Sequence, residues 1–163
     1  MSRSEILLQS IQNFYKDEKN SNYLCDILEK KKGISLRNLE WFITDYSKKR
    51  NLSYTTKDGK SFLVHCAYKS SLDGYSKKLF DPFCRTEKFE YEIPNTNGIK
   101  IHTTVAQLNF IKWCIQHNVI DYITNQSLVK QGHFCKWLCW NLCKKYTCCK
   151  KFLSLSKNKL MHW

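Results

Sequence analysis

The chain of 163 residues is 42% hydrophobic and 14% aromatic, which suffices for one hydrophobic core plus an appendage and excludes a wholly disordered or fibrous protein. Its formal net charge of +13 favours a polyanionic partner, which is nucleic acid, an anionic membrane surface or an acidic protein. No signal peptide is recognisable after Met1, and no stretch approaches the ~20 apolar residues of a transmembrane helix, so we expect a reducing compartment with free thiols. Four scattered cysteines are expected to be small buried side chains: Cys25, Cys66, Cys84 and Cys114.

Residues 1–50 are predicted to be mainly helical. Apolar residues at helical spacing indicate a helix over residues 4–30 that the polar stretch 19–22 interrupts. The lysines and glycine of residues 30–33 would end it, with cations near the negative end of the helix dipole. Ser35 is a good N-cap for a second helix to about Lys49, with a buried stripe formed by Leu36, Leu39, Ile43 and Tyr46.

Two β-hairpins are predicted next. Residues 52–56 and 61–68 have strand composition, and Asp58-Gly59 between them suits a tight turn. Alternation would place four side chains of the second strand on one face: Phe62, Val64, Cys66 and Tyr68. Residues 86–93 and 99–103 form the other hairpin around the turn at 94–98. Together the hairpins predict one antiparallel sheet of about four strands.

The stretch between the hairpins, residues 75–85 (YSKKLFDPFCR), has no regular period and predicts a connection, where function often lies. The Asp81-Pro82 step favours an extended or turn conformation. We expect Phe80, Phe83 and Cys84 to pack inward, which would leave three cations free to face a ligand: Lys77, Lys78 and Arg85. In the alternative, which composition alone somewhat favours, these are ordinary solvated charges on an anchored loop.

Residues 104–117 are predicted to form a helix that opens with a capping box. The Thr104 hydroxyl would cap the Gln107 amide while the Gln107 side chain reaches back. The expected core face comprises Val105, Leu108, Ile111, Cys114 and Ile115. Asn118 would close this helix, and a shorter helix is predicted over residues 119–129.

Residues 129–163 form a basic, Cys- and Trp-rich tail with eight lysines and no acidic residue. Cys135, Cys139 and Cys143 recur at helical spacing, so the tail is expected to be helical or partly disordered. Zinc is a minority interpretation, since CxxC pairs are absent. An interfacial helix on anionic lipid, with acylated cysteines, and a nucleic-acid tail, with stacking aromatics and phosphate-binding lysines, are equally supported.

The sequence contains no glycine-rich phosphate loop, no CxxC pair and no GxSxG elbow. We therefore expect neither an enzyme nor a bound cofactor. The remaining class is a binding protein, and its charge points to a polyanion.

Three blocks between Ser35 and Ile123 resemble the motifs of a small, largely uncharacterised protein family shared by nucleocytoplasmic large DNA viruses: SLRNLEWFITDYSKK, YKSSLDGYSKKLFDPFCR and TTVAQLNFIKWCIQHNVIDYI. The resemblance implies a location in the virus factory of the host cytoplasm and in the virion. It also implies that the central stretch is a functional surface. Arg85 is the preferred phosphate ligand there, because its planar fork can bind a phosphate in a bidentate manner.

These observations predict an α+β domain over residues 1–128, with helices packed on the sheet, followed by the tail. The predicted function is a viral accessory protein that binds DNA or RNA in late transcription or genome packaging. The predicted nucleic-acid contacts are Lys48, Lys49, Arg50, Lys69, Lys77, Lys78 and Arg85. The predicted loop-shaping residues are Tyr75, Phe80, Asp81, Pro82 and Phe83. The alternative function is a virion or factory module that binds an acidic viral protein and is tethered to an anionic membrane by its tail.

Overall fold

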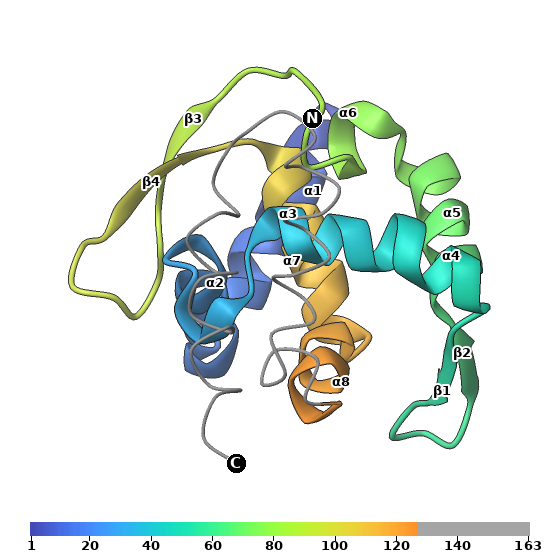
Figure 1. Ribbon diagram of the computed structural model, residues 1–163. Helices are drawn as coiled ribbons and strands as arrows, with labels where there is room; N and C mark the ends of the chain where they lie inside the picture. The colour runs from blue at the N-terminus through green and yellow to red at the C-terminus, as the bar shows by residue number, and fades with distance from the viewer. Residues whose placement is uncertain (127–163) are drawn as a thin grey trace, which may run out of the picture. The chain divides into compact units, whose positions relative to one another are not determined.

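The computed structural model describes residues 1–126 of the chain (Figure 1). The chain divides into two units, residues 1–122 and residues 123–163, and the first of these is described below. The predictions for the tail, including the zinc and lipid interpretations, lie outside the described residues. Within residues 1–126 no helix has the length and apolar character needed to cross a membrane.

Two short helices replace the first predicted helix. α1 (Arg3–Tyr15) opens with a capping box, in which Ser2 Oγ accepts from the Glu5 amide and Glu5 Oε2 accepts from the Ser2 amide. α2 (Glu18–Leu28) opens at Asp17, whose carboxylate accepts from the Lys19 amide at 2.9 Å. The break predicted at residues 19–22 is therefore wrong, because those residues lie inside α2 and the Asp17 cap sets the boundary earlier.

The predicted second helix is present, although it contains an irregular turn. A 3-10 turn, η1 (Lys31–Gly33), precedes α3 (Leu36–Trp41), which Ser35 caps as expected through the Asn38 amide. A π-helical turn, η2 (Phe42–Tyr46), then leads into α4 (Ser47–Arg50). The hydroxyls of Thr44 and Ser47 donate to carbonyls four residues earlier, which is a known way to distort a helix.

The first hairpin is shorter than predicted. β1 (Ser53–Thr55) pairs antiparallel with β2 (Ser61–Leu63), and Tyr54 lies opposite Phe62. The strand predicted through residues 64–68 is wrong, because α5 (Val64–Tyr75) begins there. Val64 and Tyr68 are buried at helical i, i+4 spacing, whereas Cys66 is exposed and not a buried residue as predicted. A short apolar run is compatible with the residue spacing of a strand and with that of a helix, and here packing against the core favours the helix.

The remaining strands form a separate hairpin. After α6 (Lys77–Phe80), β3 (Phe89–Glu92) pairs antiparallel with β4 (Lys100–Thr103). The prediction of one four-stranded sheet is wrong, since the strands within residues 1–126 form two two-stranded sheets. Figure 1 shows these hairpins on opposite sides of α7, so helices separate them. The fold is a mixture of helices and small hairpins.

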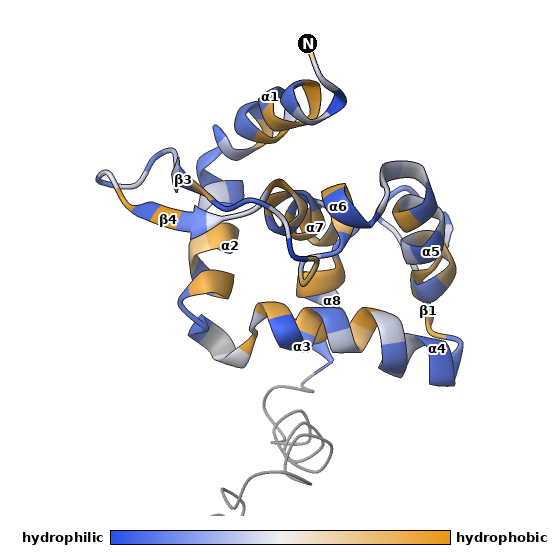
Figure 2. Ribbon diagram, turned by 90° about the horizontal axis from the view of Figure 1, so that it is seen from above, coloured by the Kyte–Doolittle hydropathy of each residue, from blue (hydrophilic) through white to orange (hydrophobic). Residues whose placement is uncertain are grey.

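α7 (Val105–Gln116) is the central helix of the first unit. Seven of its residues are buried, and it contacts α1, α2 and α6 (Figure 2). The Thr104 cap is confirmed, since Thr104 Oγ1 accepts from the Gln107 amide at 3.2 Å. Asn118 ends the helix with φ of 56°, and α8 (Val119–Asn125) follows. The fully buried side chains around α7 include Ile11, Tyr15, Leu24, Leu39, Phe42, Phe80 and Phe110.

Candidate nucleic-acid interface

The central stretch, residues 75–85, is partly helical rather than an irregular connection throughout. Ser76 adopts φ of 76°, which separates α5 from the four-residue α6. Phe80 ends α6 with its side chain 0% exposed. Its ring stacks on Tyr75, with centroids 5.6 Å apart, and meets Tyr68 and Phe110. Phe80 thus attaches α6 to the aromatic core.

Side chains of α7 hold the backbone of this stretch. Asn109, 3% exposed, donates from Nδ2 to the Leu79 carbonyl at 2.9 Å. Gln107 Nε2 donates to the carbonyl of Pro82 at 3.1 Å, and its Oε1 accepts from the Thr103 hydroxyl. The Gln107 side chain does reach back to the start of its own helix, but its Oε1 accepts from the Thr103 hydroxyl and not from the Thr104 amide as a capping box requires, while its Nε2 binds the loop. A polar residue inside an otherwise apolar helix face is the signal that could have identified Asn109.

Asp81 and Pro82 shape the turn that follows α6. Asp81 Oδ1 accepts from the Phe83 amide at 3.0 Å, and the Asp81 carbonyl accepts from the Cys84 amide at 3.1 Å. Pro82 is buried between them. These bonds direct the Phe83 side chain outward, so the expectation that Phe83 packs inward is wrong.

Phe83 is 42% exposed and has a cation on its ring. The guanidinium of Arg37, from α3, lies 4.2 Å from the ring centroid. The sequence did not single out Arg37 as this partner, because Phe83 lies 46 positions further along the chain. The pair brings an additional cation to the central stretch.

Partly buried acidic groups lie behind the same stretch. Burial raises the pKa of the Glu40 carboxyl, the Thr44 hydrogen bond and Arg37 oppose that shift, and the charge of Asp81 adds to it. Burial, followed by the charges of Asp81 and Glu40, raises the pKa of Tyr68 to about 12. The negative charge of Asp81 therefore acts on both Glu40 and Tyr68.

All seven cations predicted to bind nucleic acid are exposed. They lie in the last turn of α4 (Lys48, Lys49, Arg50), on α5 (Lys69), on α6 (Lys77, Lys78) and in the loop after it (Arg85). Lys49 pairs with Asp45 at 3.0 Å, and the Arg50 guanidinium lies over the Tyr46 ring. Within residues 1–126, the other five have no ion-pair partner.

The structure does not gather these cations at one point. The Val64 amide at the start of α5 donates to the carbonyl of Leu52, just after α4, and α6 follows the end of α5; a twelve-residue helix is about 18 Å long. The α4 group and the α6 group therefore lie at opposite ends of α5, with Lys69 between them. Such a row of charges suits an extended polyanion better than a single phosphate.

Charge is distributed unevenly along the described chain. Residues 47–85, here called the basic segment, contain nine lysines and arginines against three aspartates. Residues 1–46 contain seven basic and seven acidic side chains, and residues 86–126 contain three basic and four acidic ones. The net positive charge of residues 1–126 thus resides in the basic segment, from α4 through the loop after α6.

Among residues 1–126 no three His, Cys, Asp or Glu side chains are grouped as a metal site would require. The described residues form a small α+β protein whose net positive charge lies in the basic segment. The chain belongs to a family of unknown function, DUF7197, whose profile matches residues 1–137.

An uncharacterized protein of Acanthamoeba polyphaga mimivirus is 39% identical over 125 residues, which cover 73% of this chain and 48% of that protein. The chain therefore spans about half the length of this viral relative. No solved structure matches. These findings agree with the predicted kinship to an uncharacterised family in large DNA viruses.

Proposed function

We propose that this protein is a non-enzymatic viral accessory protein that binds nucleic acid through the basic segment. The observation that carries the proposal is the concentration of net positive charge in residues 47–85, on elements that contact one another. Nucleic acid is a linear polyanion, and its affinity for proteins comes largely from phosphate contacts made by lysine and arginine. Exposed cations near both ends of α5, with Lys69 between them, match that requirement.

The state of the cations supports this proposal. Lys69, Lys77, Lys78 and Arg85 have no ion pair within residues 1–126, so binding a phosphate there breaks no internal salt bridge. The anchored backbone from Leu79 to Cys84 holds Arg85 near a fixed position, which reduces the entropy lost on binding.

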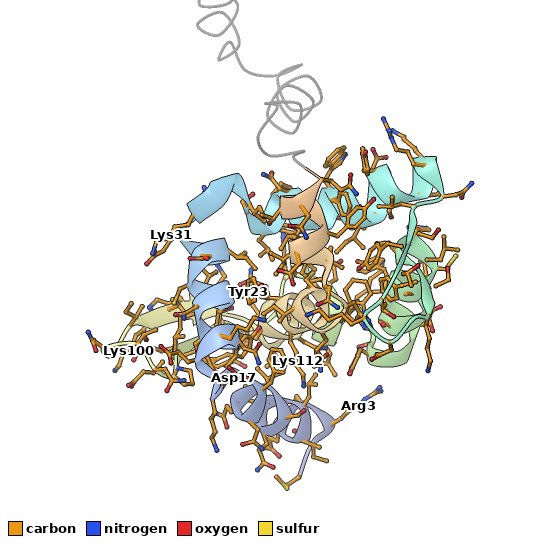
Figure 3. The ribbon with its side chains drawn as sticks, turned by 90° about the horizontal axis from the view of Figure 1, so that it is seen from below. Arg3, Asp17, Tyr23, Lys31, Lys100 and Lys112 are labelled. Atoms are coloured by element: carbon orange, nitrogen blue, oxygen red, sulfur yellow. The ribbon has the colours of Figure 1, made fainter. Side chains whose placement is uncertain are left out.

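The test is a fluorescence anisotropy titration of full-length protein with single-stranded and duplex oligonucleotides over a salt series. One variant removes three cations of the basic segment, K77A/K78A/R85A. Its matched control, K19A/K31A/K100A, removes the same charge from α2, η1 and β4. Figure 3 shows Lys31 and Lys100 on the side of the first unit away from α5, and both form exposed ion pairs.

The proposal requires that the basic-segment variant bind more weakly, and with a smaller salt dependence, than the control variant. Equal affinities would contradict it. A further full-length variant, with Lys144, Lys145, Lys150 and Lys151 changed to glutamine, tests the tail. If only that variant loses binding, the tail is the nucleic-acid site and the first unit is left as a protein-interaction module.

We propose late transcription or genome packaging as the setting of this activity, and a relative in a large DNA virus is compatible with either. Ultraviolet crosslinking in infected cells, followed by sequencing, distinguishes the two. Enrichment of viral transcripts supports transcription, and enrichment of genomic DNA supports packaging. Recovery of neither contradicts both assignments.

A further inference from the structure

Phe83 differs from the other aromatic residues of the central stretch. Tyr75 and Phe80 stack on each other and Phe80 is fully buried, whereas Phe83 projects into solvent with 42% of its surface exposed. Phe83 is exposed although hydrogen bonds hold the backbone around it. The Phe83 amide is bonded to Asp81, the preceding carbonyl is bonded to Gln107, and Pro82 is buried. The fold thus holds an aromatic ring outward in a fixed backbone.

Positive charge surrounds this ring. Arg37 lies 4.2 Å from its centroid, and Arg85 follows two residues later, which limits the Cα–Cα separation of Phe83 and Arg85 to about 7 Å. Lys77 and Lys78 belong to α6, immediately before the same turn. An exposed ring with cations on both sides along the chain is the combination by which proteins bind single strands, since the ring stacks on a base and the cations neutralise phosphates.

We infer that the ligand of this loop is single-stranded nucleic acid, with one base stacked at Phe83 and Arg37 and the adjoining phosphates bound by Arg85 and the α6 lysines. The inference rests on the proposed function and specifies its substrate. Bases in a duplex are stacked and paired, so their faces are closed to a protein side chain. The element here is a turn that follows a four-residue helix, and not the longer helix or two-stranded ribbon that enters a major groove.

The experiment compares three variants of the full-length protein: F83A, F83Y, which retains a ring, and I99A. Ile99 is 43% exposed in the β3–β4 hairpin and so matches Phe83 in exposure. Anisotropy is measured with an oligothymidylate of about 15 nucleotides and with a duplex of the same length, which covers the usual site size. Thermal unfolding of each variant confirms that the fold is retained.

F83A is expected to weaken single-strand binding by about 5- to 150-fold, the loss that removal of one stacking contact produces. F83Y and I99A should bind like the unchanged protein, and duplex binding should not respond to F83A. Photocrosslinking with an oligonucleotide that carries 5-iodouracil should attach a base at Phe83, mapped by mass spectrometry. A purely structural role for Phe83 would not produce that crosslink.

Two outcomes overturn the inference in different ways. If F83A leaves single-strand affinity unchanged while K77A/K78A/R85A lowers it, the stacking site is wrong and the proposed function stands. If neither variant affects either oligonucleotide and an acidic peptide binds instead, both are wrong, and the loop recognises protein.

Discussion

The hydrogen bond from Asn109 to the Leu79 carbonyl can be tested by removing its donor. Asn109 is 3% exposed and the partly buried bond is 2.9 Å long, so loss of the amide leaves the Leu79 carbonyl without this protein donor. An unsatisfied buried carbonyl costs about 1–3 kcal/mol. We therefore expect N109A to lower the free energy of unfolding in urea by about that amount, with part of the loss arising from the small cavity.

N109D separates the hydrogen bond from the cavity, because aspartate has nearly the shape of asparagine. At neutral pH its carboxylate places an acceptor and a buried charge against the Leu79 carbonyl, so N109D should be less stable than N109A. Burial and the facing carbonyl raise the pKa of the new carboxyl in the folded state. Its protonated form can donate to Leu79, so stability should recover as pH falls and be lost as pH rises.

The assay is urea unfolding of full-length protein at about pH 5 and about pH 7.5, with each variant compared with the unchanged protein at the same pH. Q116A is the control, because Gln116 is an exposed α7 residue for which we expect a change within about 0.5 kcal/mol. The reasoning is refuted if N109A behaves like Q116A, or if acid gives N109D no relative recovery.

Three further predictions concern the salt dependence of binding, the pH dependence of stability and the reactivity of the cysteines. K77A/K78A/R85A should reduce the slope of log K against log salt by about 2.1 for a single strand and about 2.7 for a duplex, and an unchanged slope would mean that these cations do not contact phosphate. Burial raises the pKa of Glu40, so its protonated form stabilises the folded state, and the free energy of unfolding should fall as pH rises from the ordinary glutamate pKa through the folded pKa. E40Q should flatten that part of the stability–pH curve. A curve identical to that of the unchanged protein would contradict the assignment. Iodoacetamide with mass-spectrometric mapping should label exposed Cys66 well before Cys114, whose pKa burial raises, and equal rates would show that α7 opens readily.

Local chemistry made parts of this fold predictable. The Thr104 hydroxyl determines the start of α7, Asn118 its end, and the Asp58-Gly59 turn joins β1 to β2. Each of these signals acts within four residues, and the structure confirms the prediction made from each. The second hairpin was likewise visible in the alternation of β3.

Packing between distant segments made other parts unpredictable. Val64 and Tyr68 fit a strand period and a helix period, and burial against the core chose the helix. The residue pattern within each hairpin does not indicate whether the two hairpins pair into one sheet. The outward position of Phe83 depends on Gln107 and Asp81, and its cation comes from Arg37, so the candidate site acquired its aromatic member only through tertiary contacts. The exposure of the lysines, by contrast, follows from their charge.

The π-helical turn at Phe42–Tyr46 changes the direction in which the first cations of the basic segment point. Such a turn uses one more residue than an α-helical turn, and each residue advances a helix by about 100°. The three cations of α4 therefore point about 100° away from where an uninterrupted helix would direct them. A change that restored α-helical bonding here without removing a residue would therefore rotate the cationic end around the helix axis without altering its charge.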